Sequence, residues 1–406
     1  MRLTKVEDLT QSATVLSDKL EVAIKPFLAC LSIAGLRHRR IVTEEENISI
    51  FRQLLRRKYM FYAIIILLLL WSNFLFSLKD FASVHAFDGK LCRDIISSAW
   101  FLQVAIYAAN DLVMGRYWPS FYMAWDKYTE STGTKTRSMV RNLAIFLTIF
   151  YVCWVVSSGV FLTTSALQAS RANTTVVLSS IEAIFVNIFL FTAYFYFVST
   201  WFLLTAQFAL ACFMFYRSFQ EQYRDLKADV EEKGCVSNTI ELHRLRHDNL
   251  CRLIIQADNI FSMFIFVTVA TAIPLIVFTL YFVMFETTDT FSYGATWWSV
   301  VLCTVQLFIV FIGGAAVNAA AHGSLDLLYK IDLEDFPIDK LQKLNIFLSR
   351  LNARSIGFSA FDLFIIDKPT VVTFFGSILT YAIVVIQFRS GTSGSLAVAC
   401  CNRTSA

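Results

Sequence analysis

Seven separate stretches of the sequence stay apolar for about 20 residues or more, the length at which an α-helix crosses the hydrocarbon core of a bilayer. Hydrophobic residues make up 56% of the chain and charged residues 16%, whereas a soluble domain has roughly 25% charged residues. The composition excludes a disordered chain, a nucleic-acid binder and a disulfide-stabilised secreted scaffold. A β-barrel would instead show short alternating segments separated by turn residues. The sequence therefore predicts an all-α integral membrane protein with seven transmembrane helices. The stretches cover about 59–79, 95–115, 143–165, 181–216, 259–285, 297–321 and 370–389.

A weaker apolar segment, about 22–36, precedes the first of these stretches. It is shorter than a span and contains Lys25 and Pro26. We interpret it as an interfacial or re-entrant helix, because counting it as a span would reverse the topology of everything that follows.

The distribution of basic residues predicts the orientation of the chain. With the N-terminus inside, 29 of the 35 Lys and Arg residues fall in cytoplasmic segments, in agreement with the positive-inside rule. The glycosylation sequons at Asn173 and Asn402 then lie outside, and a third sequon at Asn47 lies inside. The predicted topology has a cytoplasmic N-terminus and an extracellular C-terminus, which is inverted relative to G-protein-coupled receptors.

Several polar segments on the predicted cytoplasmic side have helical character. Residues 217–233 continue the fourth span in good helix formers, and residues 238–258 lead into the fifth. An amphipathic helix is indicated by Leu341, Leu344, Leu348 and Leu351, which repeat at helical spacing. These segments form either a packed, oligomer-forming layer or solvated helical hairpins.

The last span carries a polar stripe without charges. The polar positions and one valine are spaced three and four residues apart, so they share one helix face, with Phe388 at its edge. Such a stripe suits the wall of a water-filled pore, in which Val384 and Phe388 form a hydrophobic gate. The alternative is that small polar side chains join neighbouring helices. The stripe comprises Thr370, Thr373, Ser377, Thr380, Val384 and Gln387.

Aromatic and hydrogen-bonding side chains gather in the other spans, chiefly in their outer halves. Aromatic walls with a few polar groups are typical of a small-molecule pocket, although Trp residues are also enriched at bilayer interfaces without any ligand. The predicted ligand-binding residues are Gln103, Trp154, Asn187, Tyr194, Trp297, Trp298, Thr304 and Gln306.

Catalysis finds little support in the sequence, which lacks the common nucleotide-binding, metalloprotease and hydrolase motifs. His243 and His247 have a spacing compatible with a metal site, but Arg244 and Arg246 lie beside them and no third ligand is evident. We therefore expect an exposed helix there, and neither a metal nor a cofactor nor an enzyme activity.

The segment TYAIVVIQF in the last span resembles the signature of the insect gustatory receptor family. The signature has Thr-Tyr, five hydrophobic residues and Gln-Phe, which this sequence matches at Thr380, Tyr381, Gln387 and Phe388. The resemblance covers the whole chain in architecture and nine residues in detail. Insect odorant receptors share the architecture without the signature and are the second choice.

The resemblance implies a homotetrameric, ligand-gated, nonselective cation channel that a small-molecule tastant opens in the plasma membrane of sensory neurons. Gln387 would face the pore and Phe388 would form its gate, while Thr380 and Tyr381 would hold the helix packing around it. The ligand would bind among the second to sixth spans, and other gustatory receptor subunits are possible partners. Arg389 directly follows the gate and would ring the outer mouth, so the ion selectivity stays open.

These inferences divide the chain into four parts. Residues 1–58 form a cytoplasmic segment with the short helix, and 59–321 a six-helix ligand-binding bundle with cytoplasmic extensions. Residues 322–389 supply the anchor helix and the pore-lining helix, and 390–406 a short extracellular tail. The alternatives are a receptor that signals through a cytoplasmic partner, and a transporter, although buried charges in mid-bilayer are lacking.

Overall fold

The computed structural model describes residues 20–36, 50–81, 89–132, 136–172, 180–233, 239–285, 290–331, 337–353 and 355–403. Within these ranges the regular structure is helical apart from one isolated β-bridge between Ser359 and Ile365. The helices are α2 (Lys25–Ile33), α3 (Ile50–Phe81), α4 (Gly89–Met114), the 3₁₀ turn η1 (Gly115–Tyr117), α5 (Trp118–Thr132), α6 (Thr136–Ala172), α7 (Ser180–Lys233), α8 (Ile240–Phe285), α9 (Thr290–His322), α10 (Leu325–Leu328), α11 (Ile338–Ala353) and α12 (Lys368–Arg403). The all-α prediction is confirmed.

Each predicted span corresponds to one helix. Among the described residues, α3, α6, α7, α8 and α9 are long and apolar enough to cross a bilayer, and α12 contributes a shorter apolar part, Lys368–Val384. The second predicted span lies in α4, which is not among the helices that meet this length and hydropathy criterion. The seven helices therefore pair with the seven stretches of the sequence.

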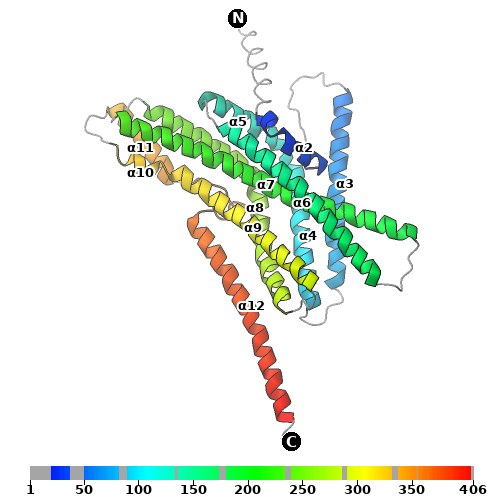
Figure 1. Ribbon diagram of the computed structural model, residues 1–406. Helices are drawn as coiled ribbons and strands as arrows, with labels where there is room; N and C mark the ends of the chain where they lie inside the picture. The colour runs from blue at the N-terminus through cyan, green and yellow to red at the C-terminus, as the bar shows by residue number, and fades with distance from the viewer. Residues whose placement is uncertain are drawn as a thin grey trace.

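α8 lies at the centre of the bundle (Figure 1). It contacts α4, α5, α7, α9, α11 and the start of α12. Most of the apolar part of α7 and α8 is buried within the chain, whereas most of that of α3 and α6 is exposed. In a membrane protein such exposed apolar surface faces lipid or another subunit.

α2 packs one of its faces on the rest of the chain. Phe27, Leu28 and Leu31 are all buried, and the helix packs against α6. The carboxylate of Asp126 in α5 accepts a hydrogen bond of 3.1 Å from the backbone N–H of Leu20 just before it. With nine residues α2 is too short to span a bilayer, and its position relative to the bilayer stays a prediction.

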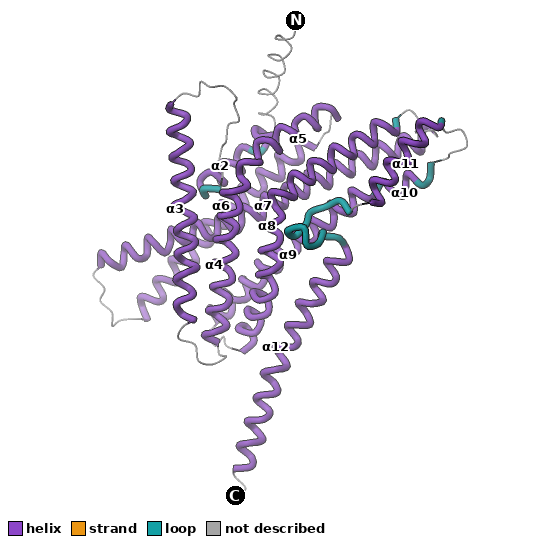
Figure 2. Tube along the Cα trace, turned by 180° about the vertical axis from the view of Figure 1, so that it is seen from behind, coloured by secondary structure: helices purple, strands orange, loops and turns teal. Residues whose placement is uncertain are grey.

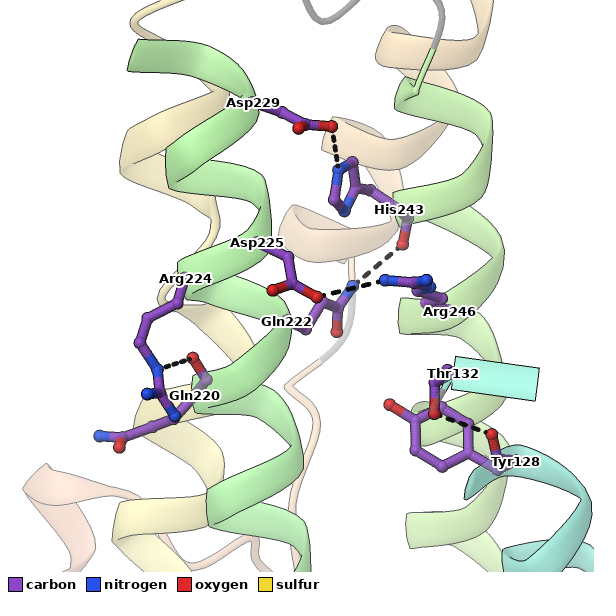
Figure 3. A network of polar contacts seen from close by, with 9 residues as sticks. All are labelled: Tyr128, Thr132, Gln220, Gln222, Arg224, Asp225, Asp229, His243 and Arg246. Atoms are coloured by element: carbon purple, nitrogen blue, oxygen red, sulfur yellow. Dashed lines mark hydrogen bonds and ion pairs between the residues drawn. The ribbon is translucent and has the colours of Figure 1, made fainter. Parts of the chain in front are cut away.

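The extensions of α7 and α8 run side by side beyond the apolar core, together with α10 and α11, as a packed helical layer (Figures 1 and 2). Polar contacts join the two extensions, as Figure 3 shows. Asp229 pairs with His243 at 3.1 Å, and Asp225 pairs with Arg246 at 3.3 Å. Gln222 donates a 2.9 Å hydrogen bond to the carbonyl of His243.

The expectation that His243 and His247 lie on an exposed helix is wrong. Both are buried, because α7 and α11 cover this face of α8. The His247 ring packs between Phe219 and Phe347, and its Nε2 lies 3.0 Å from the carbonyl oxygen of Ala321. No group of three or more His, Cys, Asp or Glu side chains suited to a metal ion occurs among the described residues.

A short hairpin, residues 355–367, separates α11 from α12 and was not anticipated from the sequence. Its Ile366 is fully buried against Gly314 of α9, where an added Cβ would lie 3.0 Å from the Cβ of Ile366. The absence of a side chain at Gly314 therefore permits a close approach, and the close neighbour there is the hairpin.

We predict that Gly314→Ala lowers stability by about 1–3 kcal/mol, the usual cost of overpacking a site that cannot expand. Gly376→Ala is the matched control, because an added Cβ meets no atom within 4 Å there. Thermal unfolding of the purified protein measures both. Equal unfolding temperatures for the two variants would contradict the packing described.

Candidate ligand site and candidate pore

A network of buried polar side chains joins α4, α8 and α9 inside the membrane-spanning bundle. The Tyr107 hydroxyl accepts hydrogen bonds from Gln103 Nε2 at 2.7 Å and from Gln306 Nε2 at 3.1 Å. It also contacts Thr268 Oγ1, whose own proton goes to the carbonyl of Phe264, so Tyr107 donates in that contact. Polar groups of this kind, buried in an apolar bundle, strongly favour one arrangement of the three helices.

Gln306 is the centre of this network. Its Oε1 accepts hydrogen bonds from Trp201 Nε1 at 3.0 Å and from Gln103 Nε2 at 3.3 Å, and its Nε2 donates to Thr205 Oγ1 at 3.1 Å. With Tyr107, these partners use the full hydrogen-bonding capacity of the amide. In contrast, Gln103 Oε1 is buried without a partner and is able to accept a hydrogen bond from a ligand.

Trp154 and Trp298 lie in a stack of nearly parallel aromatic rings contributed by α6, α7 and α9. Their ring centroids are 5.6 Å apart with an interplanar angle of 24°. Phe202 of α7 stacks on Trp154 at 6.5 Å and on Phe150 at 5.6 Å. Trp298 is 54% exposed, so the end of the stack presents a flat apolar surface.

Two further predicted ligand residues, Tyr194 and Thr304, have other partners than these two groups. Tyr194 packs against Phe197 and lines a cavity of only about 10 Å³, which has room for roughly one water molecule. Thr304 bonds the carbonyl of Val300 within its own helix, and Trp297 is 39% exposed. The side chain of Asn187 lies outside the described residues.

A larger apolar groove lies between α7 and α9 and contains none of the predicted ligand residues. Its volume is about 440 Å³. The sequence did not reveal it, because Ala and Cys at these positions look like ordinary helix packing. Its lining consists of Ala209, Cys212, Phe213, Tyr216, Val305, Phe308, Ile309, Ile312, Gly313 and Ala316.

α12 leaves the bundle and runs away from it to the C-terminus (Figures 1 and 2). Phe374 packs on Phe311 at 4.5 Å, and Phe375 stacks on Phe308 at 5.0 Å, so these side chains mark the face toward the bundle. Ile378 and Ala382 continue that face and are buried.

The polar stripe of α12 lies away from this bundle-facing side. Thr373, Thr380, Val384 and Gln387 are exposed, as is Tyr381, while Thr370 and Ser377 are half-buried. The side chain of Phe388 lies outside the described residues, as do Asn173 and the side chains of Arg389 and Asn402.

The hydroxyls of the stripe bond to their own helix. Thr373 donates to the carbonyl of Pro369 at 3.1 Å, and Ser377 and Thr380 donate to the carbonyls four residues before them at 2.9 Å each. Within the chain these side chains therefore join no neighbouring helix.

The helices, the buried network and the protruding last helix together describe a seven-helix membrane protein. Residues 111–391 match the model of the 7tm chemosensory receptor family, and the chain belongs to that family. No curated protein matches the chain in sequence.

Two solved structures have the same fold. One is the insect olfactory receptor OR5 from Machilis hrabei in complex with eugenol, at 13% identity and a TM-score of 0.70, with 92% of this chain and 99% of that chain covered. The other is a second structure of the insect olfactory receptor OR5 from Machilis hrabei, at 14% identity and a TM-score of 0.70, with 91% of this chain and 100% of that chain covered. At this identity the likeness concerns the fold.

We predict that Gln306→Leu lowers the stability of the purified receptor by about 1–3 kcal/mol, since buried Trp201 and Gln103 donors lose their acceptor. Thr304→Val, two residues earlier on α9, removes only a bond within the helix and should change stability by less than about 0.5 kcal/mol. Thermal unfolding in detergent compares them. A Gln306 variant as stable as the Thr304 variant would show that the network is dispensable.

Proposed function

We propose that the protein is a gustatory receptor that works as a ligand-gated, nonselective cation channel opened by a small-molecule tastant. It acts in the plasma membrane of sensory neurons, with its N-terminus in the cytoplasm. Four copies surround a central pore lined by α12. Membership of the chemosensory receptor family supports the class, and the signature at Thr380–Phe388 favours taste over smell.

The observation that carries this proposal is the position of α12. Only one face of α12 packs on the bundle, so the helix is incomplete in a single chain. Val372 and Leu379 on one side and most of the polar stripe on another are exposed. In a ring of copies the apolar side contacts neighbouring subunits and the stripe lines water. Self-bonded hydroxyls suit that wall, because their remaining lone pairs point outward toward passing cations.

The ligand site of the proposal combines the unpartnered Gln103 Oε1 with the aromatic stack of Trp154 and Trp298. The flat aromatic faces would contact the apolar body of the tastant, and the amide oxygen would accept a hydrogen bond from it. Binding opens the channel only if the ligand prefers the open arrangement of the bundle to the closed one.

The odorant-receptor-like channel is the second candidate function, favoured by the fold shared with OR5, which was solved with eugenol. Eugenol therefore belongs in the first ligand panel beside sugars and bitter compounds. A receptor that signals through a cytoplasmic partner is the third, motivated by the basic inner segments of the sequence.

We predict that excised patches from cells expressing this chain alone carry a ligand-evoked cation current without cytoplasm. Gln387→Ala should change the unitary conductance, because its amide sits on the proposed pore face. Ile383→Ala, an exposed apolar position off the stripe, is the control and should leave conductance unchanged. Responses confined to intact cells would favour the coupled receptor instead.

We further predict that cysteines at Thr373, Ser377 and Thr380 react with a water-soluble thiosulfonate and reduce the current. Cysteine at Leu379, 63% exposed but off the stripe, should react far more slowly, since lipid or a neighbouring subunit covers it. The unmodified protein serves as background, because Cys153 is itself exposed. Equal rates at all four positions would contradict the pore assignment.

A further inference from the structure

Residues 355–367 form a tight β-hairpin between α11 and α12. Ile366 N–H bonds the carbonyl of Phe358 at 2.9 Å, and Ala360 N–H bonds the carbonyl of Phe364 at 2.9 Å. Leu363 N–H closes the turn on Ala360 at 3.0 Å. The two central residues of the turn, Phe361 and Asp362, have φ angles of 53° and 58°, a region that L-residues other than Gly rarely adopt. Such a conformation persists where surrounding contacts over-determine it.

One aromatic side chain of the hairpin inserts into the bundle. Phe358 is fully buried, and its ring lies 5.0 Å from Phe208 and 6.0 Å from Phe215 of α7, measured between centroids. It also lies 6.1 Å from Phe261 of α8. These ring contacts of Phe358 fix the hairpin against both central helices.

Asp258 of α8 holds the hairpin by a two-point contact. Its Oδ1 accepts a 2.6 Å hydrogen bond from Ser359 N–H, and its Oδ2 accepts a 2.8 Å hydrogen bond from Ser359 Oγ. Ser359 Oγ in turn accepts a hydrogen bond from Asp362 N–H at 3.3 Å inside the turn. The carboxylate therefore binds the hairpin and supports its turn at once, through charge-assisted bonds.

α9 supplies further contacts of the hairpin. Asn318 Nδ2 donates to the carbonyl of Ile356 at 3.0 Å, and His322 Nε2 accepts from Ile356 N–H at 3.1 Å. Ile366 rests on Gly314, as described above. The hairpin is thus bonded to α8 and α9 and packed on α7, so its position depends on the relative positions of all three helices.

The hairpin ends in the N-cap of α12. Asp367 Oδ1 accepts hydrogen bonds from Thr370 Oγ1 at 2.6 Å and Thr370 N–H at 2.9 Å, and these bonds hold the pKa of Asp367 below its usual range. Thr370 Oγ1 also contacts the carbonyl of Ile365 at 3.2 Å, which ties the first turn of α12 back to the hairpin. Hairpin and helix start therefore move as one piece.

We propose that this hairpin couples the α7–α9 bundle to α12, and that Asp258 is the positioning residue that transmits bundle movement to the proposed pore helix. α12 rises about 30 Å between Lys368 and Gln387, at about 1.5 Å per residue. A rotation of roughly 5° at its base therefore displaces Gln387 by roughly 2–3 Å. The gating part of this inference rests on the channel function proposed above.

The first test uses hydrogen exchange of the full chain in lipid nanodiscs, followed by mass spectrometry. Asp258→Ala removes both bonds to Ser359 and should speed exchange about tenfold at residues 358–366 and, with them, in the first turns of α12. Asp258→Asn should restore protection, because its oxygen accepts from Ser359 N–H and its amide donates to Ser359 Oγ. Asp248→Ala is the matched control, since Asp248 on the same helix bonds the exposed Arg252.

The hydrogen-exchange experiment tests the coupling between the hairpin and α12, and it requires no ligand. Faster exchange confined to the hairpin, with α12 unchanged, would overturn the proposal, as would a hairpin unaffected by Asp258→Ala. If Asp258→Ala fails to fold, Ser359→Ala replaces it, because that variant keeps the backbone bond to Asp258 and should show a smaller increase in both segments.

The second test measures gating in excised patches under eugenol, sugars and bitter compounds. Asp258→Ala should shift the half-maximal concentration of an active compound several-fold, leave unitary conductance unchanged, and be rescued by Asp258→Asn. A variant that only lowered the number of channels would reduce current without that shift, and this result would count against the proposal. Absence of current from the unmodified protein would contradict the channel function and leave the exchange result to decide the coupling.

Discussion

The packing of α4, α7 and α9 around α8 is the constraint on which the rest of the structure depends. A helix in lipid gains no hydrophobic free energy by contacting another helix, so association relies on close packing and buried polar bonds. Both are present here: Tyr107 packs on Phe264 at 4.7 Å and bonds Thr268 one turn later, and Gly313 lets α9 approach Cys212 of α7 closely. These contacts hold the central helices in one arrangement and leave α3, α6 and α12 as outer elements.

The helices of this arrangement were readable from the sequence because apolar length and helical spacing are local signals. The same holds for the α7 extension, whose residues 217–233 are good helix formers, and for the leucine pattern of α11. The sequence predicts that Gln103 and Gln306 belong to the same ligand site, but it does not predict a hydrogen bond between them. That the two amides bond each other depends on how α4 and α9 both pack on α8, which no local pattern encodes.

The sequence failed where tertiary contacts decide. α5 has no apolar run, yet Phe121 and Trp125 are buried because α7 and α8 cover them. His243 was judged by its charged neighbours, although an α7 carboxylate lies beside it in the fold. The hairpin escaped notice because its seven-residue core alternates too briefly to signal a strand, and because positive φ at Phe361 has no residue signature. Both left-handed residues are imposed by the contacts of Phe358 and Ser359.

The polar stripe of α12 shows how a helix that protrudes from the bundle can be stable in a membrane. A Thr or Ser hydroxyl exposed to lipid would be costly, but bonding to the carbonyl four residues earlier removes that cost before any partner arrives. The helix can therefore insert on its own and meet its neighbours later, held at its base by the hairpin and along one face by contacts such as those of Phe374 and Phe375. Because the hairpin contacts the base of α12, a movement of the bundle tilts the helix from its base. A rigid helix transmits that tilt along its length, whereas a flexible helix would bend and absorb it. An element that ends in an N-cap, as the hairpin does at Asp367, supplies that rigidity at the first turn.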